Sequence, residues 1–318
     1  MGWNDAERVR AARARALAFD GERELERVEA MGARVLDCDE LPDLLRSIID
    51  PPTALYALGE LAPRHAVAVV GSRGPTPYGL RMARRLAGDA AAAGLVVVSG
   101  LARGIDAAAH RAALDAGGTT WAVIGSGLGC LYPPEHADLA RELVAAGGAL
   151  LTEMPLDMAP LPDNFPRRNR LVSGLAWATV VVEGRHRSGS GVTAKQALEQ
   201  GREVLAVPGP ADSPLSEVPL RLLAGGAGLA RNLDDILAVL PPGAGRPAPT
   251  RPDEGSPPDL EDEEGRILSL LGSDALSLDE LARASGLDTA RLSSIMFGLE
   301  LKSLVVFVPG QRYAQKTR

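Results

Sequence analysis

The chain has 318 residues, of which 46% are hydrophobic, 24% are charged and only 3% are aromatic, and its formal net charge is −7. This length exceeds one typical core, so we expect two or three domains of an ordinary globular protein. The negative charge argues against indiscriminate coating of nucleic acid, but residues 51–240 balance 17 basic against 17 acidic side chains, so a local basic site can lie there.

The chain contains few cysteines and histidines. Two cysteines, Cys38 and Cys130, and four histidines offer neither a disulfide framework nor the spacing of a metal cluster. A run of 18 apolar residues is absent, and the charged N-terminus excludes a signal peptide. We therefore expect a cytoplasmic protein with no membrane segment, no metal and no cofactor.

The N-terminal part is rich in charge. Residues 5–31 read as two short helices around Gly21, and residues 1–43 are predicted to form a short helical N-terminal segment. Leu44–Gly59 then leads the chain into a sheet, because Pro51-Pro52 ends the helix before it.

A sustained alternation of apolar runs and helical patterns follows. Strands are predicted at 66–70, 95–98, 119–124, 149–151, 178–182 and 203–207. Helices are predicted between most of them, at 79–93, 105–116, 135–147 and 192–201. The alternation predicts an open, doubly wound α/β sheet with mostly parallel strands over residues 44–240. Ligands of such sheets bind beyond the carboxyl ends of the strands, so the loops that follow the strands form the candidate site.

The strongest local signal lies in Ala66–Gly104, which has the span of one βαβ unit. Its turn Gly71-Ser72-Arg73-Gly74 points backbone N–H groups and a helix N-terminus at one spot, which favours phosphate, and the arginine adds a bidentate donor. The turn lacks the lysine of a P-loop, and glycines at 71, 74 and 79 do not match a dinucleotide fingerprint. For any single glycine, a tight strand-to-helix turn is an equally good explanation.

The loops after the strands share one chemistry, since small residues, hydroxyls and arginines dominate them. Acids capable of proton transfer are few, namely Asp106, Glu153, Glu183 and Glu199. Because no catalytic pattern stands out, phosphate capture without catalysis is the more economical hypothesis. Phe165–Arg170 places an aromatic ring beside arginines, which is typical of single-strand binding, although ion pairs to neighbouring helices are an alternative for these arginines. The candidate DNA-binding residues are Gly71, Ser72, Arg73, Tyr78, Ser99, Gly100, Gly104, Phe165, Arg167, Arg168, Asn169, Arg170, Ser188, Gly189, Ser190 and Thr193.

The C-terminal part is predicted to be separate. Residues 241–258 read as a Pro/Gly-rich linker, and residues 259–318 as a small winged-helix domain. Its expected elements are helices at Glu261–Leu271, from Ser277 and at Thr289–Leu301, and a hairpin of Leu304–Val308 and Arg312–Ala314. The third helix contains only one basic residue, Arg291, which favours an interaction module over a reader of the DNA groove and leaves both open.

Six strings between Leu44 and Leu240 carry a family resemblance: VAVVGSRGPTPYG, SGLARGIDAAAH, GCLYPPEH, FPRRNRLVSGL, SGSGVTAKQALEQGREVLAVPG and GGAGL. In order and spacing they resemble the DNA-processing protein A family, also called DprA or Smf. The resemblance implies an extended Rossmann-like domain that binds single-stranded DNA, forms a homodimer and loads a RecA-type recombinase in natural transformation, without catalysis. It also implies that Gly71-Ser72-Arg73 and Phe165–Arg170 belong to the binding site, and that a winged-helix tail follows.

Two features depart from the family's pattern. Residues 1–43 are shorter than its helical N-terminal domain of sterile-alpha-motif type, so a truncated form is expected here. Val218 and Leu220 stand where the family commonly has glycine and asparagine.

The alternative function is that of a phosphoribohydrolase-like enzyme acting on nucleoside monophosphates. Its glycine-threonine turn is echoed in Gly189–Thr193, but its catalytic glutamate and arginine have no convincing counterpart.

Overall fold

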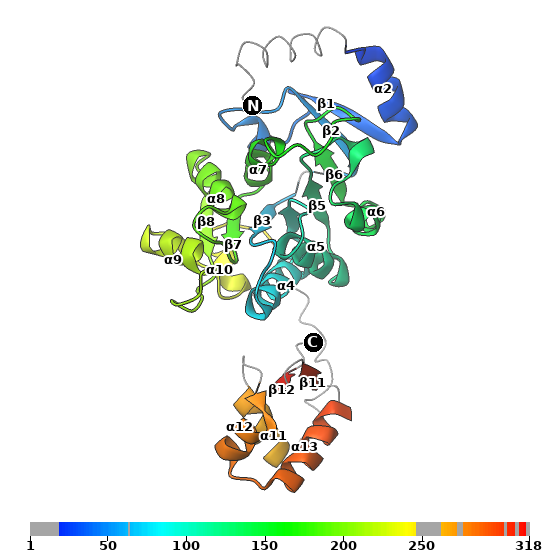
Figure 1. The fold of residues 1–318 in the computed structure, drawn as a ribbon. Coiled ribbons are helices and arrows are strands. Elements are labelled where there is room, and N and C mark those ends of the chain that lie inside the picture. Colours follow the sequence, from blue (N-terminus) through cyan, green and yellow to red (C-terminus); the bar gives the residue numbers. More distant parts are fainter. Residues whose placement is uncertain are drawn as a thin grey trace, which may run out of the picture. The chain divides into compact units, whose positions relative to one another are not determined.

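The computed structural model describes residues 19–62, 64–245, 262–271, 276–301, 304–308 and 312–315. The chain forms two units, Met1–Ala248 and Pro249–Arg318, here called the core unit and the C-terminal unit (Figure 1). The strands of the core unit are β1 (Ala33–Asp37), β2 (Ala54–Gly59), β3 (Ala66–Val70), β4 (Val96–Ser99), β5 (Thr120–Val123), β6 (Ala149–Thr152), β7 (Ala178–Val181), β8 (Glu203–Ala206) and β9 (Gly228–Leu229).

These strands form one nine-stranded sheet in the order β1-β2-β6-β5-β4-β3-β7-β8-β9. Strands β3 to β9 pair in parallel, whereas β1 and β2 are antiparallel to their neighbours. From β3 the chain builds outward through β4 and β5 to β6 and then returns to place β7 on the other side of β3. The direction of winding therefore reverses at β3, and such a reversal opens a crevice at the carboxyl ends of the strands.

Helices cover both faces of the sheet because its central strands are apolar on both sides. In β3, Ala68 and Val70 pack into one core cluster and Val67 and Val69 into the opposite one. The first cluster includes residues of α7 (Asn164–Gly174), α8 (Gly189–Glu199) and α9 (Glu217–Ala224), and also Leu45 of the short helix α3 (Asp43–Arg46). The second includes residues of α4 (Pro77–Ala92), α5 (Ile105–Asp115) and α10 (Leu233–Leu237). A third cluster packs α6 (Ala137–Ala145) and Val28 of α2 (Gly21–Ala30) against residues of β1, β2, β5 and β6.

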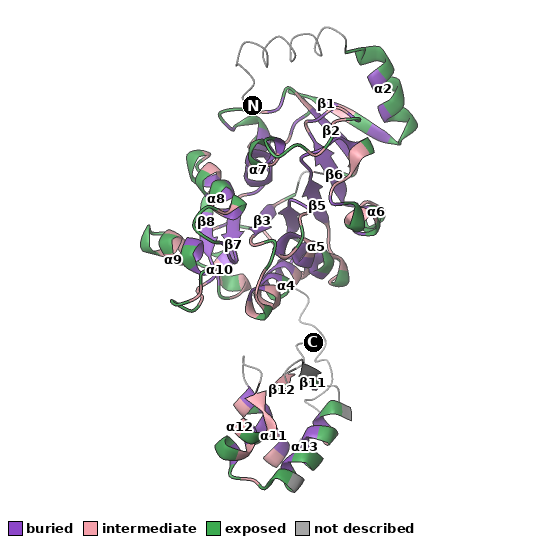
Figure 2. Cartoon of the chain, in the orientation of Figure 1, coloured by how far each residue is buried: buried purple, intermediate pink, exposed green. Residues whose placement is uncertain are grey.

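This arrangement confirms the predicted doubly wound, mostly parallel α/β sheet, whose central strands β3 to β7 are purple in Figure 2 because they are buried. Besides β2, β9, α9 and α10, which were not predicted as strands or helices, three segments differ from the prediction. The segment 1–43, described from residue 19 onward, contains the strand β1 besides the helix α2, because Ala33 and Leu36 are buried in core clusters on opposite sides of the strand. The segment Phe165–Arg170, expected as a loop, lies in α7, and α8 begins at Gly189 rather than at residue 192.

The C-terminal unit has the predicted winged-helix elements. They are α11 (Asp262–Leu271), β10 (Leu276–Ser277), α12 (Leu278–Ser285), α13 (Thr289–Leu301), β11 (Val305–Val308) and β12 (Arg312–Gln315), with the sheet order β10-β12-β11. Ser277 and Glu280 form a capping box that starts α12. The Arg291 side chain donates a hydrogen bond from Nε to Glu263 Oε2 over 2.9 Å. The one basic residue of the third helix therefore lies in an ion pair.

Two further predictions concern the part of the chain that the structure describes incompletely. Of the linker expected at 241–258, only residues 241–245 lie within the described residues, and of the helices expected at 5–31 only the second does. None of the described helices has both the length and the apolar character that crossing a bilayer would require.

Candidate functional site

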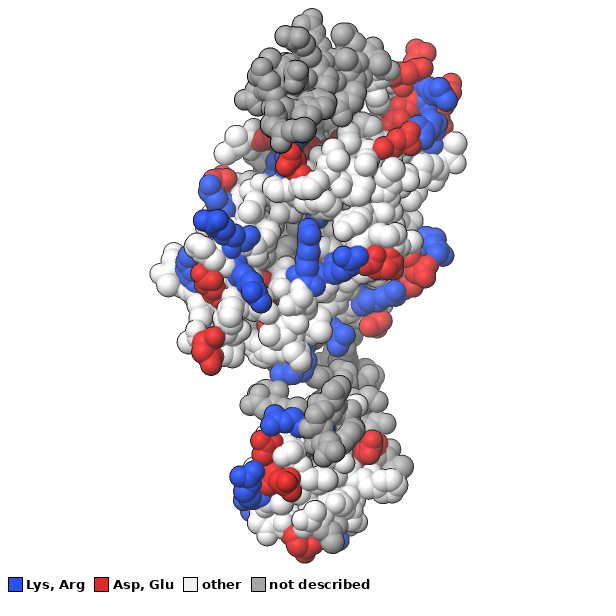
Figure 3. All heavy atoms as spheres, in the orientation of Figure 1, with Lys and Arg blue, Asp and Glu red and all other residues white. Residues whose placement is uncertain are grey.

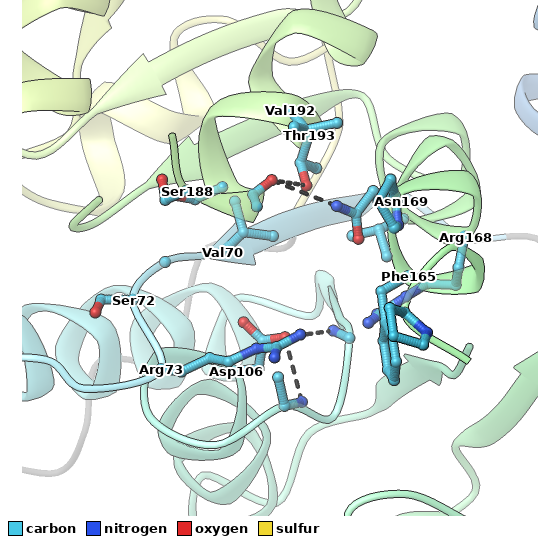
Figure 4. A pocket seen from close by; sticks show the side chains of 18 of the residues that line it. Val70, Ser72, Arg73, Asp106, Phe165, Arg168, Asn169, Ser188, Val192 and Thr193 are labelled. Atoms are coloured by element: carbon cyan, nitrogen blue, oxygen red, sulfur yellow. Dashed lines mark hydrogen bonds between the residues drawn. The ribbon is translucent and has the colours of Figure 1, made fainter. Parts of the chain in front are cut away.

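A pocket of about 830 Å³ opens at the carboxyl ends of the central strands, where the winding reverses (Figure 4). Its walls come from the loops after β3 and β4, the start of α7, and the loop from β7 into α8. The sequence-predicted residues that line it are Gly71, Ser72, Arg73, Gly100, Phe165, Arg168, Asn169, Ser188, Gly189, Ser190 and Thr193. Tertiary structure thus brings together residues that are more than a hundred positions apart.

One wall consists of a cation above an aromatic ring. Arg73 is exposed, and its Cζ lies 5.4 Å from the centroid of the Phe165 ring. Tyr132 packs edge-on against the same ring, with 5.8 Å between the ring centroids. No carboxylate of the described residues forms an ion pair with Arg73. The wall therefore offers an uncompensated guanidinium group beside a flat apolar surface.

The floor of the pocket is a buried arginine. Arg168 is 4% exposed, and its Nη1 donates to the carbonyl oxygen of Val123 over 2.7 Å, while its Nε has no hydrogen-bond partner. Burial lowers the pKa of Arg168 to about 10, an effect that the nearby Asp106 carboxylate opposes. Gly100 makes this placement sterically feasible, since a Cβ there would lie 1.8 Å from Arg168 Nη1.

Asp106 is the one of the four acids noted in the sequence that lines the pocket. Its Oδ2 accepts hydrogen bonds from the backbone N–H groups of Gly100 at 3.1 Å and Ala102 at 3.3 Å. Burial raises the pKa of this carboxyl, while Arg168 and the backbone donors lower it. Asp106 therefore holds the loop after β4 in place beneath the pocket.

Glu183, which follows β7, is only 4% exposed and binds the start of α4. Its Oε2 accepts the backbone N–H of Thr76 at 2.9 Å, and its Oε1 accepts the Thr76 hydroxyl. The Thr76 Oγ1 in turn accepts the N–H of Gly79 and caps α4. The sequence predicted a phosphate at this helix N-terminus, but in the structure a carboxylate of the protein lies there.

The start of α8 has a different environment. Ser188, its N-cap residue, makes no side-chain hydrogen bond to the helix backbone, and the first turn contains no acidic residue. Arg185 and Arg187 precede it, are exposed and line the pocket, and no carboxylate of the described residues pairs with them. Sequence reasoning missed both arginines, although they stand directly before the glycine-hydroxyl turn. In Figure 3 basic side chains lie across the middle of this face of the core unit.

Five of the predicted residues lie outside the pocket lining: Tyr78, Ser99, Gly104, Arg167 and Arg170. The Tyr78 hydroxyl donates to the carbonyl oxygen of Pro208 at 2.6 Å, and the Ser99 hydroxyl to that of Val69 at 2.7 Å. Gly104 begins α5 with a φ of +81°, a conformation that favours glycine. Tyr78, Ser99 and Gly104 therefore stabilise the loops at the strand ends without lining the pocket.

Helical periodicity explains why the arginines of α7 diverge. Phe165, Arg168 and Asn169 share one face of the helix and line the pocket, whereas Arg167 and Arg170 lie on another. The Arg170 guanidinium group binds the Glu153 carboxylate through two hydrogen bonds, at 2.9 and 2.6 Å, and it also pairs with Asp50 at 3.0 Å. Ion pairing, the alternative weighed for these arginines, therefore applies to Arg170.

The remaining acid, Glu199, pairs with Lys195 at 3.5 Å on the exposed surface of α8. Together with Glu153 and Glu183, it is thus engaged outside the pocket lining.

The buried His110, one turn along α5 from Asp106, should make the stability of the core unit depend on pH. The Thr120 hydroxyl donates to the carbonyl oxygen of Val97 and so accepts from His110 Nδ1 at 2.7 Å, while His110 Nε2 has no partner. Burial, followed by the charges of His136 and Arg168, lowers the pKa of His110 to about 3.

The unfolded chain binds a proton at His110 below about pH 6.5, whereas the folded chain does not until near pH 3. The free energy of unfolding should therefore fall as the pH drops through this window. Thermal melts should show a larger decrease in Tm from pH 7 to pH 5 for the wild type than for His110→Gln. Equal decreases would contradict the assignment.

Comparison with known proteins assigns the two units to related families. A family model described as DNA recombination-mediator protein A matches residues 34–241, and one described as DprA winged helix domain matches residues 249–311. Protein Smf of Escherichia coli is 42% identical over 280 residues, covering 86% of this chain and 75% of that protein. DNA processing protein DprA of Bacillus subtilis is 42% identical over 205 residues, covering 64% of this chain and 69% of that protein.

Two solved structures share the fold. DNA processing protein A of Streptococcus pneumoniae matches with a TM-score of 0.63 and 36% identity, covering 71% of this chain and 80% of that one. DNA processing protein A of Helicobacter pylori, whose structure concerns its single-stranded DNA binding mode, matches with a TM-score of 0.58 and 28% identity, covering 65% of this chain and 94% of that one.

Proposed function

The chain belongs to the DNA recombination-mediator protein A family, also called DprA or Smf, and on that premise we propose that its core unit binds single-stranded DNA in the pocket beyond β3, β4 and β7. The strongest support is the combination, in this one pocket, of guanidinium groups without carboxylate partners and two aromatic rings in edge-to-face contact. The relative from Helicobacter pylori is described as binding single-stranded DNA.

Each part of the pocket has a role in the proposal. Arg73, Arg185 and Arg187 contact phosphates of the strand, and the N–H groups at the start of α8 contact one more. Unpaired bases stack on the Phe165 and Tyr132 rings. A duplex would not bind in this way, because its bases are already paired and stacked on one another. The small and hydroxyl residues among the predicted set let the sugar–phosphate backbone approach closely. They are Gly71, Ser72, Gly100, Ser188, Gly189, Ser190 and Thr193.

A gel-shift series tests this function. The full chain and a shorter chain ending at Leu240 should both retard oligothymidine much more strongly than a duplex of the same length. Equal retardation of duplex and single strand, or none of either, would contradict the proposal.

We further propose that the protein loads a RecA-type recombinase on the bound strand during transformation, as a cytoplasmic homodimer that joins through the core unit. Recombinase filaments should form faster on single-stranded DNA in the presence of this protein, and sedimentation should give twice the chain mass.

The proposal includes no catalysis, since three of the four candidate acids are engaged outside the pocket lining and Asp106 binds backbone N–H groups. Release of base from nucleoside monophosphates would instead support the enzyme alternative.

Salt should weaken the binding, and the size of the effect should report how many phosphates the protein neutralises. For a single strand, each neutralised phosphate contributes a slope of about −0.7 in a plot of log affinity against log salt concentration. Arg185→Ala should therefore make the slope shallower by about 0.7, because Arg185 faces the pocket without a carboxylate partner.

The matched control is Arg141→Ala, which removes an exposed arginine that pairs with Asp138 on α6. Its slope should equal that of the wild type. Identical slopes for all three proteins would remove Arg185 from the site.

A further inference from the structure

Glu183 lies where a strand–turn–helix unit usually offers its anion site. A helix N-terminus after the first strand of such a sheet attracts phosphate, because its N–H groups lack partners within the helix. In this protein the start of α4 is that position, and the Glu183 carboxylate, rather than solvent, faces it.

The surroundings of Glu183 resemble those of a bound anion. One carboxylate oxygen accepts the Thr76 backbone N–H at 2.9 Å and the other accepts the Thr76 hydroxyl. Gly79, in the first turn of α4, makes room for the group, since a Cβ there would lie 2.3 Å from the Glu183 carboxyl carbon. A backbone N–H, a hydroxyl and a glycine thus enclose one negative group at 4% exposure.

We infer that Glu183 is a specificity-determining residue: its carboxylate occupies the phosphate position of the first βα turn and excludes free phosphate and nucleoside monophosphates from it. A second anion in the same enclosed position would meet both the bulk and the charge of the carboxylate. A DNA strand is not excluded, because its affinity comes from several contacts along the pocket. The inference deepens the proposed function, on which it rests, by naming the ligands that are rejected at the turn after β3, whose residues Gly71, Ser72 and Arg73 line the pocket.

Removing the carboxylate should open the position. Glu183→Ala deletes one CH2 and the carboxylate and leaves the Thr76 and Gly79 groups in place. In calorimetric titrations at low ionic strength, this variant should bind inorganic phosphate about tenfold more tightly than the wild type. A nucleoside 5′-monophosphate should show the same gain. Loss of a merely structural contact would not create affinity for a new ligand.

Two controls isolate the cause. Glu183→Gln keeps the space filled and the acceptor for Thr76 N–H, so it should gain no phosphate affinity. Glu199→Gln removes one negative charge from the exposed surface of α8, outside the pocket lining, and should also gain none. A gain in Glu183→Gln equal to that in Glu183→Ala would overturn the inference, as would the absence of a gain in folded Glu183→Ala.

Folding is followed in the same experiments. If Glu183→Ala is unstable, phosphate should raise its Tm more than chloride at the same ionic strength, and Glu183→Ser should behave alike. Equal melting in the two salts for both variants overturns the inference. Oligothymidine binding by the wild type is measured in parallel, since its absence would contradict the proposed function while leaving the phosphate comparison interpretable.

Discussion

Arg73→Ala is expected to weaken oligothymidine binding by about 10- to 100-fold while the core unit stays folded. Arg73 is exposed, lies 5.4 Å above the Phe165 ring and has no carboxylate partner among the described residues. Its removal therefore deletes a phosphate contact and one side of a stacking surface, but no internal bond that holds the loop after β3. Fluorescence anisotropy of a labelled oligonucleotide measures the affinity, and circular dichroism with thermal melting checks the fold.

Two variants refine the interpretation of Arg73. Arg73→Lys keeps the charge but loses the planar group over Phe165, so its affinity should fall between those of the wild type and Arg73→Ala. Arg84→Ala removes an exposed arginine of α4 that does not line the pocket, and it should bind like the wild type. Wild-type affinity of Arg73→Ala at moderate salt would remove Arg73 from the site.

Gly100→Ala is expected to abolish most single-strand binding through one added methyl group. The new Cβ would lie 1.8 Å from Arg168 Nη1 and 2.6 Å from its Cζ, so the buried guanidinium group must move. Its movement breaks the hydrogen bond to the Val123 carbonyl oxygen and separates Arg168 from Asp106. Overpacking of this kind costs about 1–3 kcal/mol of stability, and a displaced Arg168 would also fill part of the pocket.

The matched control for Gly100→Ala is Gly74→Ala in the loop after β3. A Cβ at Gly74 would meet no atom within 4 Å, so this variant should keep both the Tm and the affinity of the wild type. Binding is compared below the Tm of both variants, where each is folded. Wild-type stability and affinity of Gly100→Ala would show that Arg168 does not form a rigid floor.

Local patterns in the sequence were sufficient for much of the fold. Alternating apolar runs and helical segments predicted β3 to β8 and the crossover helices α4, α5, α6 and α8. A buried strand and a helix that packs on a sheet each give the apolar residues a spacing that can be recognised in the sequence. The winged-helix elements followed from the same periodicity and from the Ser277 cap. The resemblance to the DprA family, carried by six strings, is confirmed by the family model over residues 34–241.

The strands β1, β2 and β9 were not recognised in this way. β9 has two residues, and β1 and β2 gain their stability from antiparallel pairing at the edge of the sheet rather than from a long local pattern. The prediction of Phe165–Arg170 as a loop failed for another reason. Pro166 and the four polar residues after it hide a helical period whose buried partners lie elsewhere in the chain.

Sequence alone located the pocket, because parallel strands deliver their carboxyl ends, and the glycines and arginines after them, to one edge of the sheet. Only the tertiary structure decided which of those groups are available to a ligand. Glu183 accepts hydrogen bonds from Thr76 across 107 positions and Arg170 forms an ion pair with Asp50 across 120, and both contacts engage groups that looked free along the chain. Such contacts depend on how the elements pack and on the direction in which each helix turns its side chains, and no local period records either.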